Sequence, residues 1–163
     1  MIEVYYWEAI SGNGKQKESV GHSSMLISFD DDEGCYAAYV SWWPKGDIWG
    51  SPSFTDRAFS NDVADENRKP TKTYRFTNIL NERKALDFWN EWKKNVQYKL
   101  WSRNCSTTVL EILKAAGIKD YVTIFDPDPI DPSFVSSVCY SVYQKLTRYP
   151  KLYMKPGMAV SVY

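Results

Sequence analysis

The stretch that decides the fold runs from Val20 to Pro44 and reads VGHSSMLISFDDDEGCYAAYVSWWP. Its first ten residues alternate between a mixed face that carries His22 and an apolar face that carries Met25, which is the period of a β-strand. An acidic turn that ends at Gly34 follows, and a second β-rich run stops at the proline. The stretch therefore predicts a β-hairpin with His22 near one end.

Outward from this hairpin, the chain predicts further short strands and three helices. The expected strands cover residues 2–10, 96–101 and 157–163, residues 71–80 alternate briefly, and the expected helices cover residues 81–95, 105–116 and 132–147. Asn81 is the expected cap of the first helix, and Gly117 the left-handed stop of the second. Residues 45–70 are rich in Gly, Pro, Ser, Asp and Asn and are expected to form an irregular loop that serves as a lid or binding surface.

The composition excludes several classes of protein. A chain of 163 residues with 44% hydrophobic and 25% charged residues predicts one globular domain over 1–163. Its 20 basic and 20 acidic side chains cancel, which disfavours nucleic acid as a partner. The sequence shows neither a signal peptide nor an apolar run long enough for a membrane span, so we expect a soluble protein.

Cysteine and histidine are scarce in this chain. The three cysteines, Cys35, Cys105 and Cys139, form no CxxC pair, and there is one histidine. Neither a disulfide framework nor a metal site is therefore expected, and no cofactor is implied. Cys35 and Cys139 lie in apolar segments, where we expect them to pack without reacting.

The segment SRNCSTTVL, residues 102–110, offers a candidate nucleophile. Asn104 can cap a helix whose first residue is Cys105, and the unpaired amides and dipole of a helix start favour an anion. A nearby imidazole would lower the pKa of such a thiol further. The same amides could receive a developing oxyanion, so this segment predicts a nucleophile and part of an oxyanion hole.

A thiol nucleophile usually needs a base, and His22 is the one candidate in the chain. Ser41, in the strand expected beside that of His22, is the first candidate to orient the imidazole, and Tyr39 is the second. The alternative is that Cys105 and His22 are both packing residues, since buried cysteines and hydrogen-bonded histidines are common in protein interiors.

Three motifs resemble a known family. GHSSMLI on an early strand, YVSWWP on the next and RNCSTTVLEILKAAG at a later helix start resemble the circularly permuted branch of the NlpC/P60 papain-like superfamily. This branch includes lecithin:retinol acyltransferase-like proteins. The same motifs resemble domains of bacterial toxin effectors. The resemblance implies an α+β papain-like fold, in which a central antiparallel sheet faces the N-terminus of the Cys105 helix.

The resemblance also implies roles for individual residues. Cys105 is the implied nucleophile, His22 the base and Ser41 the third polar group. Related proteins often use a second histidine as the third group, which this chain lacks. Asn104 caps the helix beside the oxyanion hole, and the side chains that could line a substrate site are Tyr39, Trp42, Trp43 and Trp49.

The implied activity is that of a cysteine hydrolase or acyltransferase that forms a thioester acyl-enzyme. Its substrate would be an envelope phospholipid or peptidoglycan, and the two remain open at this point. An effector of this kind implies a cognate immunity protein and export from the producing cell by a dedicated secretion system. The rival hypothesis is a binding module without turnover that recognises a partner protein through the aromatic residues of 45–70.

Overall fold

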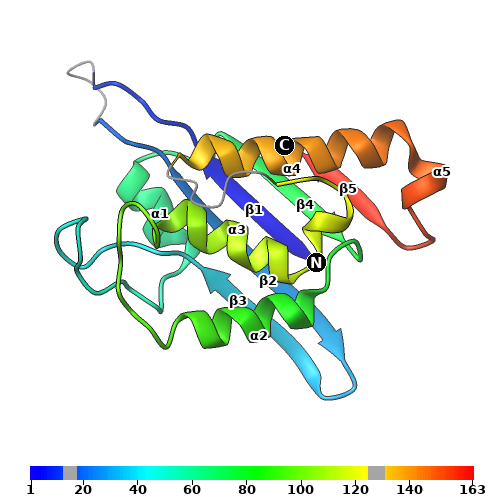
Figure 1. The fold of residues 1–163 in the computed structure, drawn as a ribbon, viewed down its shortest axis with the longest axis horizontal. Coiled ribbons are helices and arrows are strands. Elements are labelled where there is room, and N and C mark those ends of the chain that lie inside the picture. Colours follow the sequence, from blue (N-terminus) through cyan, green and yellow to red (C-terminus); the bar gives the residue numbers. More distant parts are fainter. Residues whose placement is uncertain (13–17, 125–130) are drawn as a thin grey trace.

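Five antiparallel strands form the sheet on which the candidate site is built. The computed structural model describes residues 1–12, 18–124 and 131–163 and has an α+β fold with the strand order β3-β2-β1-β4-β5. The strands are β1 (Ile2–Trp7), β2 (His22–Asp31), β3 (Gly34–Val40), β4 (Lys72–Thr77) and β5 (Ala159–Val162). In Figure 1, β1 runs through the middle of this sheet.

The predicted hairpin is confirmed. β2 and β3 pair antiparallel from Met25 opposite Val40 to Asp31 opposite Gly34. β2 begins before this pairing starts, so that His22 lies opposite Trp7 of β1. The first residue of β2 and the residues that follow β3 therefore meet at one end of the sheet.

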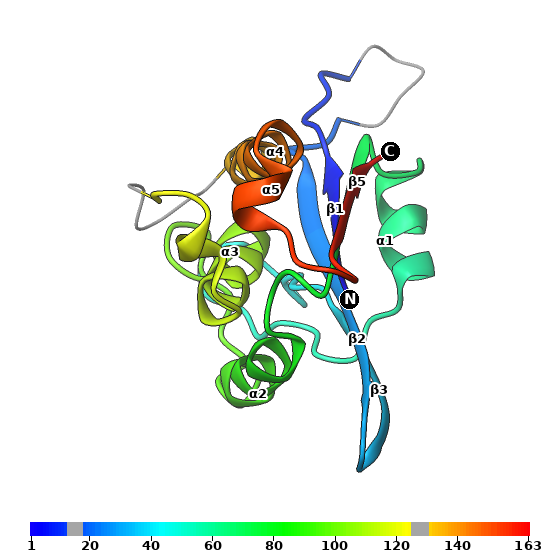
Figure 2. The ribbon, with the colours of Figure 1, turned by 90° about the vertical axis from the view of Figure 1, so that its right-hand side faces the viewer.

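Helices cover both faces of the sheet. They are α1 (Phe59–Glu66), α2 (Glu82–Trp92), α3 (Cys105–Ala115), α4 (Pro132–Arg148) and the short α5 (Pro150–Tyr153). Figure 2 shows α1 on one face, and α2, α3 and α4 on the other. α3 packs against β2, α2 and α4, and its buried residues Val109, Ile112 and Leu113 belong to the main hydrophobic core.

Local sequence signals set the ends of these helices as expected. The side chain of Asn81 accepts a hydrogen bond from the backbone of Lys84, and Gly117 ends α3 with a φ of 93°. The predicted helix over 132–147 is α4, which begins after the capping side chain of Asp131. The predicted terminal strand is β5.

Three expectations were wrong. Residues 45–70 are not irregular throughout, because they contain α1, whose buried residues are the charged Asp62 and Glu66. No apolar period marks such a helix. Residues 96–101 do not form a strand, since Gln97 and Lys99 make only isolated bridges. Cys35 is exposed rather than packed, because the end of the β2–β3 hairpin extends beyond the core.

No helix among the described residues has both the length and the hydrophobicity that a membrane span requires.

Candidate active site

Cys105 lies at the first position of α3, as the sequence predicts. The side-chain oxygen of Asn104 accepts a hydrogen bond of 2.8 Å from the backbone N–H of Thr107, and the Thr107 hydroxyl accepts one of 2.9 Å from the backbone N–H of Asn104. The Asn104 amide group also donates to the carbonyl of Leu100 at 2.6 Å. This double cap fixes the start of the helix, so the thiol sits where the unpaired helix amides favour an anion.

His22 reaches Cys105 from the start of β2. The two side chains line the same cavity and interact, so that each shifts the pKa of the other, and the His22 Nε2 atom lies 3.0 Å from Asp62 Oδ2. Because Nε2 faces the carboxylate, Nδ1 is the ring nitrogen left for the thiol. Gly21 precedes the histidine with a φ of 84°, and a Cβ there would lie 2.8 Å from the Trp7 carbonyl oxygen, so glycine permits this approach of the chain.

Asp62, on α1, is the group that orients the imidazole, and sequence reasoning missed it. The residue is fully buried. Besides His22, four side chains donate to its carboxylate: Tyr39 at 2.7 Å, Ser41 at 2.8 Å, Trp43 at 2.9 Å and Arg57 at 3.1 Å. A buried charge is tolerated only when it is paired and hydrogen-bonded, and this carboxylate meets both conditions.

The predicted orienting residues act through this carboxylate. Ser41 Oγ lies 2.8 Å from Asp62 Oδ1 but 3.4 Å from His22 Nε2, so its stronger contact is with the aspartate. Tyr39 donates to the same carboxylate and contacts Ser24. An ionised acceptor binds the imidazole N–H more strongly than a hydroxyl does. Asp62 therefore occupies the role expected of Ser41, and Ser41 and Tyr39 hold Asp62 in place.

The environment favours an ion pair between Cys105 and His22. Burial alone would lower the pKa of His22, but the hydrogen bond to Asp62 and the interaction with Cys105 outweigh it and raise the pKa to about 9. Burial likewise acts to raise the pKa of Cys105, but the hydrogen bond and charge of His22, the Ser23 backbone N–H and the Ser106 hydroxyl lower it. Thiolate and imidazolium thus stabilise each other.

The pKa of Asp62 is also set by burial acting against hydrogen bonds and a neighbouring charge. Burial acts to raise it, but the hydrogen bond and charge of His22 and the hydroxyls of Tyr39 and Ser41 hold it well below its usual range. The carboxylate therefore stays ionised across the pH range in which the cysteine and the histidine titrate.

A cavity of about 580 Å³ opens onto the thiol and the imidazole. Its lining is mainly apolar, from side chains that include Val20, Trp42, Trp43, Ile48, Tyr98 and Leu100, with Asn104 at the helix start. The cavity is large enough for a hydrocarbon chain or a small peptide segment, and its walls favour the former.

The predicted lining residues divide between two places. Trp42 and Trp43 line the cavity, whereas Trp49 is 63% exposed and contacts Trp101 with ring centroids 6.4 Å apart. Tyr39 is not among the residues that line this cavity, and its hydroxyl donates to Asp62 instead. Tyr98 lines the cavity without having been predicted, and burial together with the charge of Cys105 raises the pKa of its hydroxyl.

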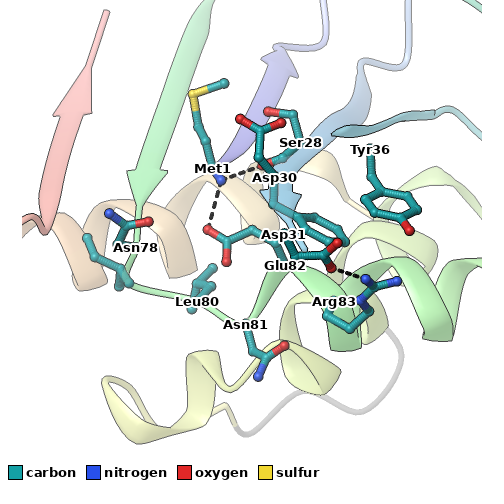
Figure 3. Close-up of a pocket in the computed structure, with 12 residues that line it drawn as sticks. Met1, Ser28, Asp30, Asp31, Tyr36, Asn78, Leu80, Asn81, Glu82 and Arg83 are labelled. Atoms are coloured by element: carbon teal, nitrogen blue, oxygen red, sulfur yellow. Dashed lines mark hydrogen bonds and ion pairs between the residues drawn. The ribbon is translucent and has the colours of Figure 1, made fainter. Parts of the chain in front are cut away.

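A second cavity, of about 870 Å³, lies elsewhere on the molecule and offers no comparable chemistry. Figure 3 shows that several of its polar groups bind one another: the amine of Met1 contacts Glu82 and the carbonyl of Ser28, and Arg83 pairs with Asp31. Among the described residues that line it, there is no cysteine or histidine.

Comparison of the chain with protein-family models, curated proteins and solved structures finds no match. The function therefore has to be argued from the site itself. Among the residues that the structure describes, no group of three or more His, Cys, Asp or Glu side chains is arranged to hold a metal ion.

Replacing Asp62 with Asn should destabilise the fold. The amide cannot accept from all the donors that surround the carboxylate, and the imidazolium loses its partner. Breaking a buried ion pair typically costs about 3–5 kcal/mol, so we expect a loss of this order in the free energy of unfolding, measured by urea denaturation. Asp65→Asn is the matched control, because that exposed carboxylate also pairs with Arg57 and should change stability by less than about 1 kcal/mol. If both substitutions changed the free energy of unfolding equally, the buried Asp62 carboxylate would not be the stabilising group that we describe.

The pH dependence of alkylation should reveal the lowered pKa of Cys105. The thiolate reacts with iodoacetamide and the thiol does not, so the rate falls as pH drops through the pKa of the folded cysteine. Because His22 lowers that pKa, the reaction should persist well below pH 9 in the native chain, and His22→Ala should move the midpoint upward. The measurement is mass-spectrometric mapping of labelled Cys105 between pH 5 and 10.

This labelling experiment needs a Cys35→Ser background, because Cys35 is exposed and would react with the reagent. Cys139 is buried, and burial raises its pKa, so it serves as an internal unreactive control. A midpoint for Cys105 that does not move in His22→Ala would show that the histidine does not govern the thiol.

Proposed function

We propose that this chain is a cysteine-dependent acyl hydrolase or acyltransferase. One observation supports the proposal: the Cys105 thiol and the His22 imidazole lie together at the wall of an apolar cavity, and the buried carboxylate of Asp62 binds that imidazole. A cysteine that only fills space in the core does not need an imidazole beside it. Here the imidazole is held in position by the Asp62 carboxylate, which accepts from five side chains. Perturbed pKa values that converge on a cavity are typical of catalytic sites.

The reaction would proceed through a thioester. The Cys105 thiolate attacks the carbonyl carbon of an ester and forms the S–C bond, while the backbone amides at the start of α3 would stabilise the oxyanion. The C–O bond then breaks, and His22 gives its proton to the departing alkoxide. Water or another acceptor alcohol next attacks the thioester, His22 takes its proton, and the S–C bond breaks to restore the thiolate.

The resemblance to the permuted NlpC/P60 papain-like superfamily supports this proposal. The chain places histidine before cysteine, puts the cysteine after a capping asparagine at a helix start, and sets both against an antiparallel sheet. Asp62 supplies the third group that the lack of a second histidine leaves open. By this resemblance we infer a papain-like fold and the role of an antibacterial effector with a cognate immunity protein.

The cavity favours a lipid ester as the substrate over a peptide amide. Its walls are mainly hydrocarbon and indole surface, which accommodate an acyl chain, whereas a peptide would bring backbone groups that need hydrogen-bond partners. We therefore propose the acyl ester of a membrane phospholipid as the substrate class, with peptidoglycan as the competing outcome in the test.

The purified chain should release fatty acid from bacterial phospholipids. We expect free fatty acid and lysophospholipid by mass spectrometry, no released peptide from purified peptidoglycan, and at least a 10³-fold loss of rate in Cys105→Ala and in His22→Ala. Cys139→Ala, which removes a buried thiol away from the cavity, is the matched control and should retain activity.

Release of peptides instead of fatty acid would overturn the substrate assignment but keep the mechanism. Full turnover in His22→Ala would overturn the mechanism. If neither substrate is cleaved and folded protein leaves Cys105 unreactive toward iodoacetamide at neutral pH, the chain is better explained as a binding module.

A further inference from the structure

Four exposed apolar side chains line the catalytic cavity or directly follow a residue that lines it. They are Val20, Ile48, Trp49 and Trp101, and we call them the aromatic rim. Val20 is 84% exposed, Trp49 63% and Trp101 58%. Tryptophan is seldom left so open on a protein surface, and its amphipathic ring is favoured where an apolar medium meets water.

The rim is held together by backbone pairing between two loops. The Leu100 N–H donates to the Ile48 carbonyl at 3.1 Å, and the Tyr98 N–H donates to the Ser51 carbonyl at 2.8 Å. In Figure 1 these loops, coloured cyan and yellow-green, lie at one edge of the molecule, beside the start of α3. The two tryptophans are thus presented by a fixed support.

The rim is continuous with the interior of the cavity. Val20 and Ile48 are both exposed and part of the cavity lining, in company with Cys105 and His22. Leu100, beside Trp101, lines the cavity as well. Exposed apolar side chains therefore share one cavity lining with the nucleophile.

Two lysines flank the rim. Lys45 and Lys99 are exposed, and neither ammonium forms an ion pair with any residue that the structure describes, while the Lys45 ammonium lies 5.3 Å from the centre of the Phe54 ring. The neighbouring Asp47 turns its carboxylate to the backbone N–H of Trp49, at 2.8 Å. Indole rings next to exposed ammonium groups match the apolar boundary and the anionic headgroups of a bilayer surface.

We propose that the aromatic rim docks this protein on an anionic lipid bilayer, with the mouth of the catalytic cavity turned toward the membrane. Its role in delivering an acyl chain to Cys105 rests on the proposed function, but docking itself does not. A second copy of the chain is a poorer occupant, because a stable interface takes about 20–30 residues from each side and the rim has four.

Vesicle binding tests the docking surface. The full chain carrying Cys105→Ala, which leaves the lipid intact, is sedimented with vesicles of phosphatidylcholine alone and of phosphatidylcholine with one quarter phosphatidylglycerol. We expect Trp49→Ala and Trp101→Ala each to weaken binding at least about tenfold. Lys99→Gln should weaken binding about fivefold on the anionic vesicles and leave it unchanged on the neutral ones.

Tyr140→Ala is the matched control, since it removes an exposed aromatic residue in the middle of α4 that also stacks on a neighbour, Tyr143. It should bind vesicles like the parent. Trp49→Ala in the catalytically intact chain should keep its cleavage of a water-soluble short-chain ester, which also shows that it is folded. It should lose cleavage of vesicle lipid.

Three outcomes would overturn the docking surface: no binding to either vesicle, equal binding by the parent and the tryptophan variants, or a dimer in light scattering that Trp49→Ala dissociates. Vesicle binding that depends on the tryptophans, with no ester cleaved by the intact chain, would keep the docking surface and remove the proposed function. Ester cleavage without vesicle binding would keep the proposed function and remove the docking surface.

Discussion

The buried carboxylate of Asp62 is the constraint on which the rest of the site depends. An unpaired charge in a protein interior costs several kcal/mol, so the donors around this one must all be present in the folded state. They come from β2, from the end of β3 and from the loop before α1, and they include His22, Ser41 and Arg57. One carboxylate thereby ties together three segments that are distant in the sequence and fixes the imidazole among them.

The consequence for Cys105 follows from this positioning. The imidazole held by Asp62 carries a proton more readily than a free histidine, and its charge stabilises the thiolate at the start of α3. The Asn104 cap fixes the helix from the other side. Two faces of the sheet cooperate, since α1 supplies the carboxylate from one face and α3 supplies the cysteine from the other. In the proposed reaction, the apolar cavity would determine which carbonyl compounds reach Cys105 and His22.

Much of this arrangement could be predicted because its signals are local. The alternation around Met25 predicts β2, and the asparagine before Cys105 together with the apolar period after it predicts α3. Asp62 could not be predicted, because α1 is a short helix that buries Asp62 and Glu66 and exposes much of its apolar surface. Its role arises from tertiary hydrogen bonds, which leave no periodic trace in a sequence. Ser41, the first candidate that the sequence offers, donates a hydrogen bond to Asp62.

The most direct test is an NMR titration of the imidazole of His22, which is the one histidine in the chain and therefore gives an unambiguous signal. Because Asp62 and Cys105 both raise its pKa, the imidazolium should persist until about pH 9 in the native chain. Asp62→Asn and Cys105→Ala should each lower the midpoint. A native midpoint near the ordinary value of about 6.5, unmoved by either substitution, would contradict the ion pair and the catalytic role built on it.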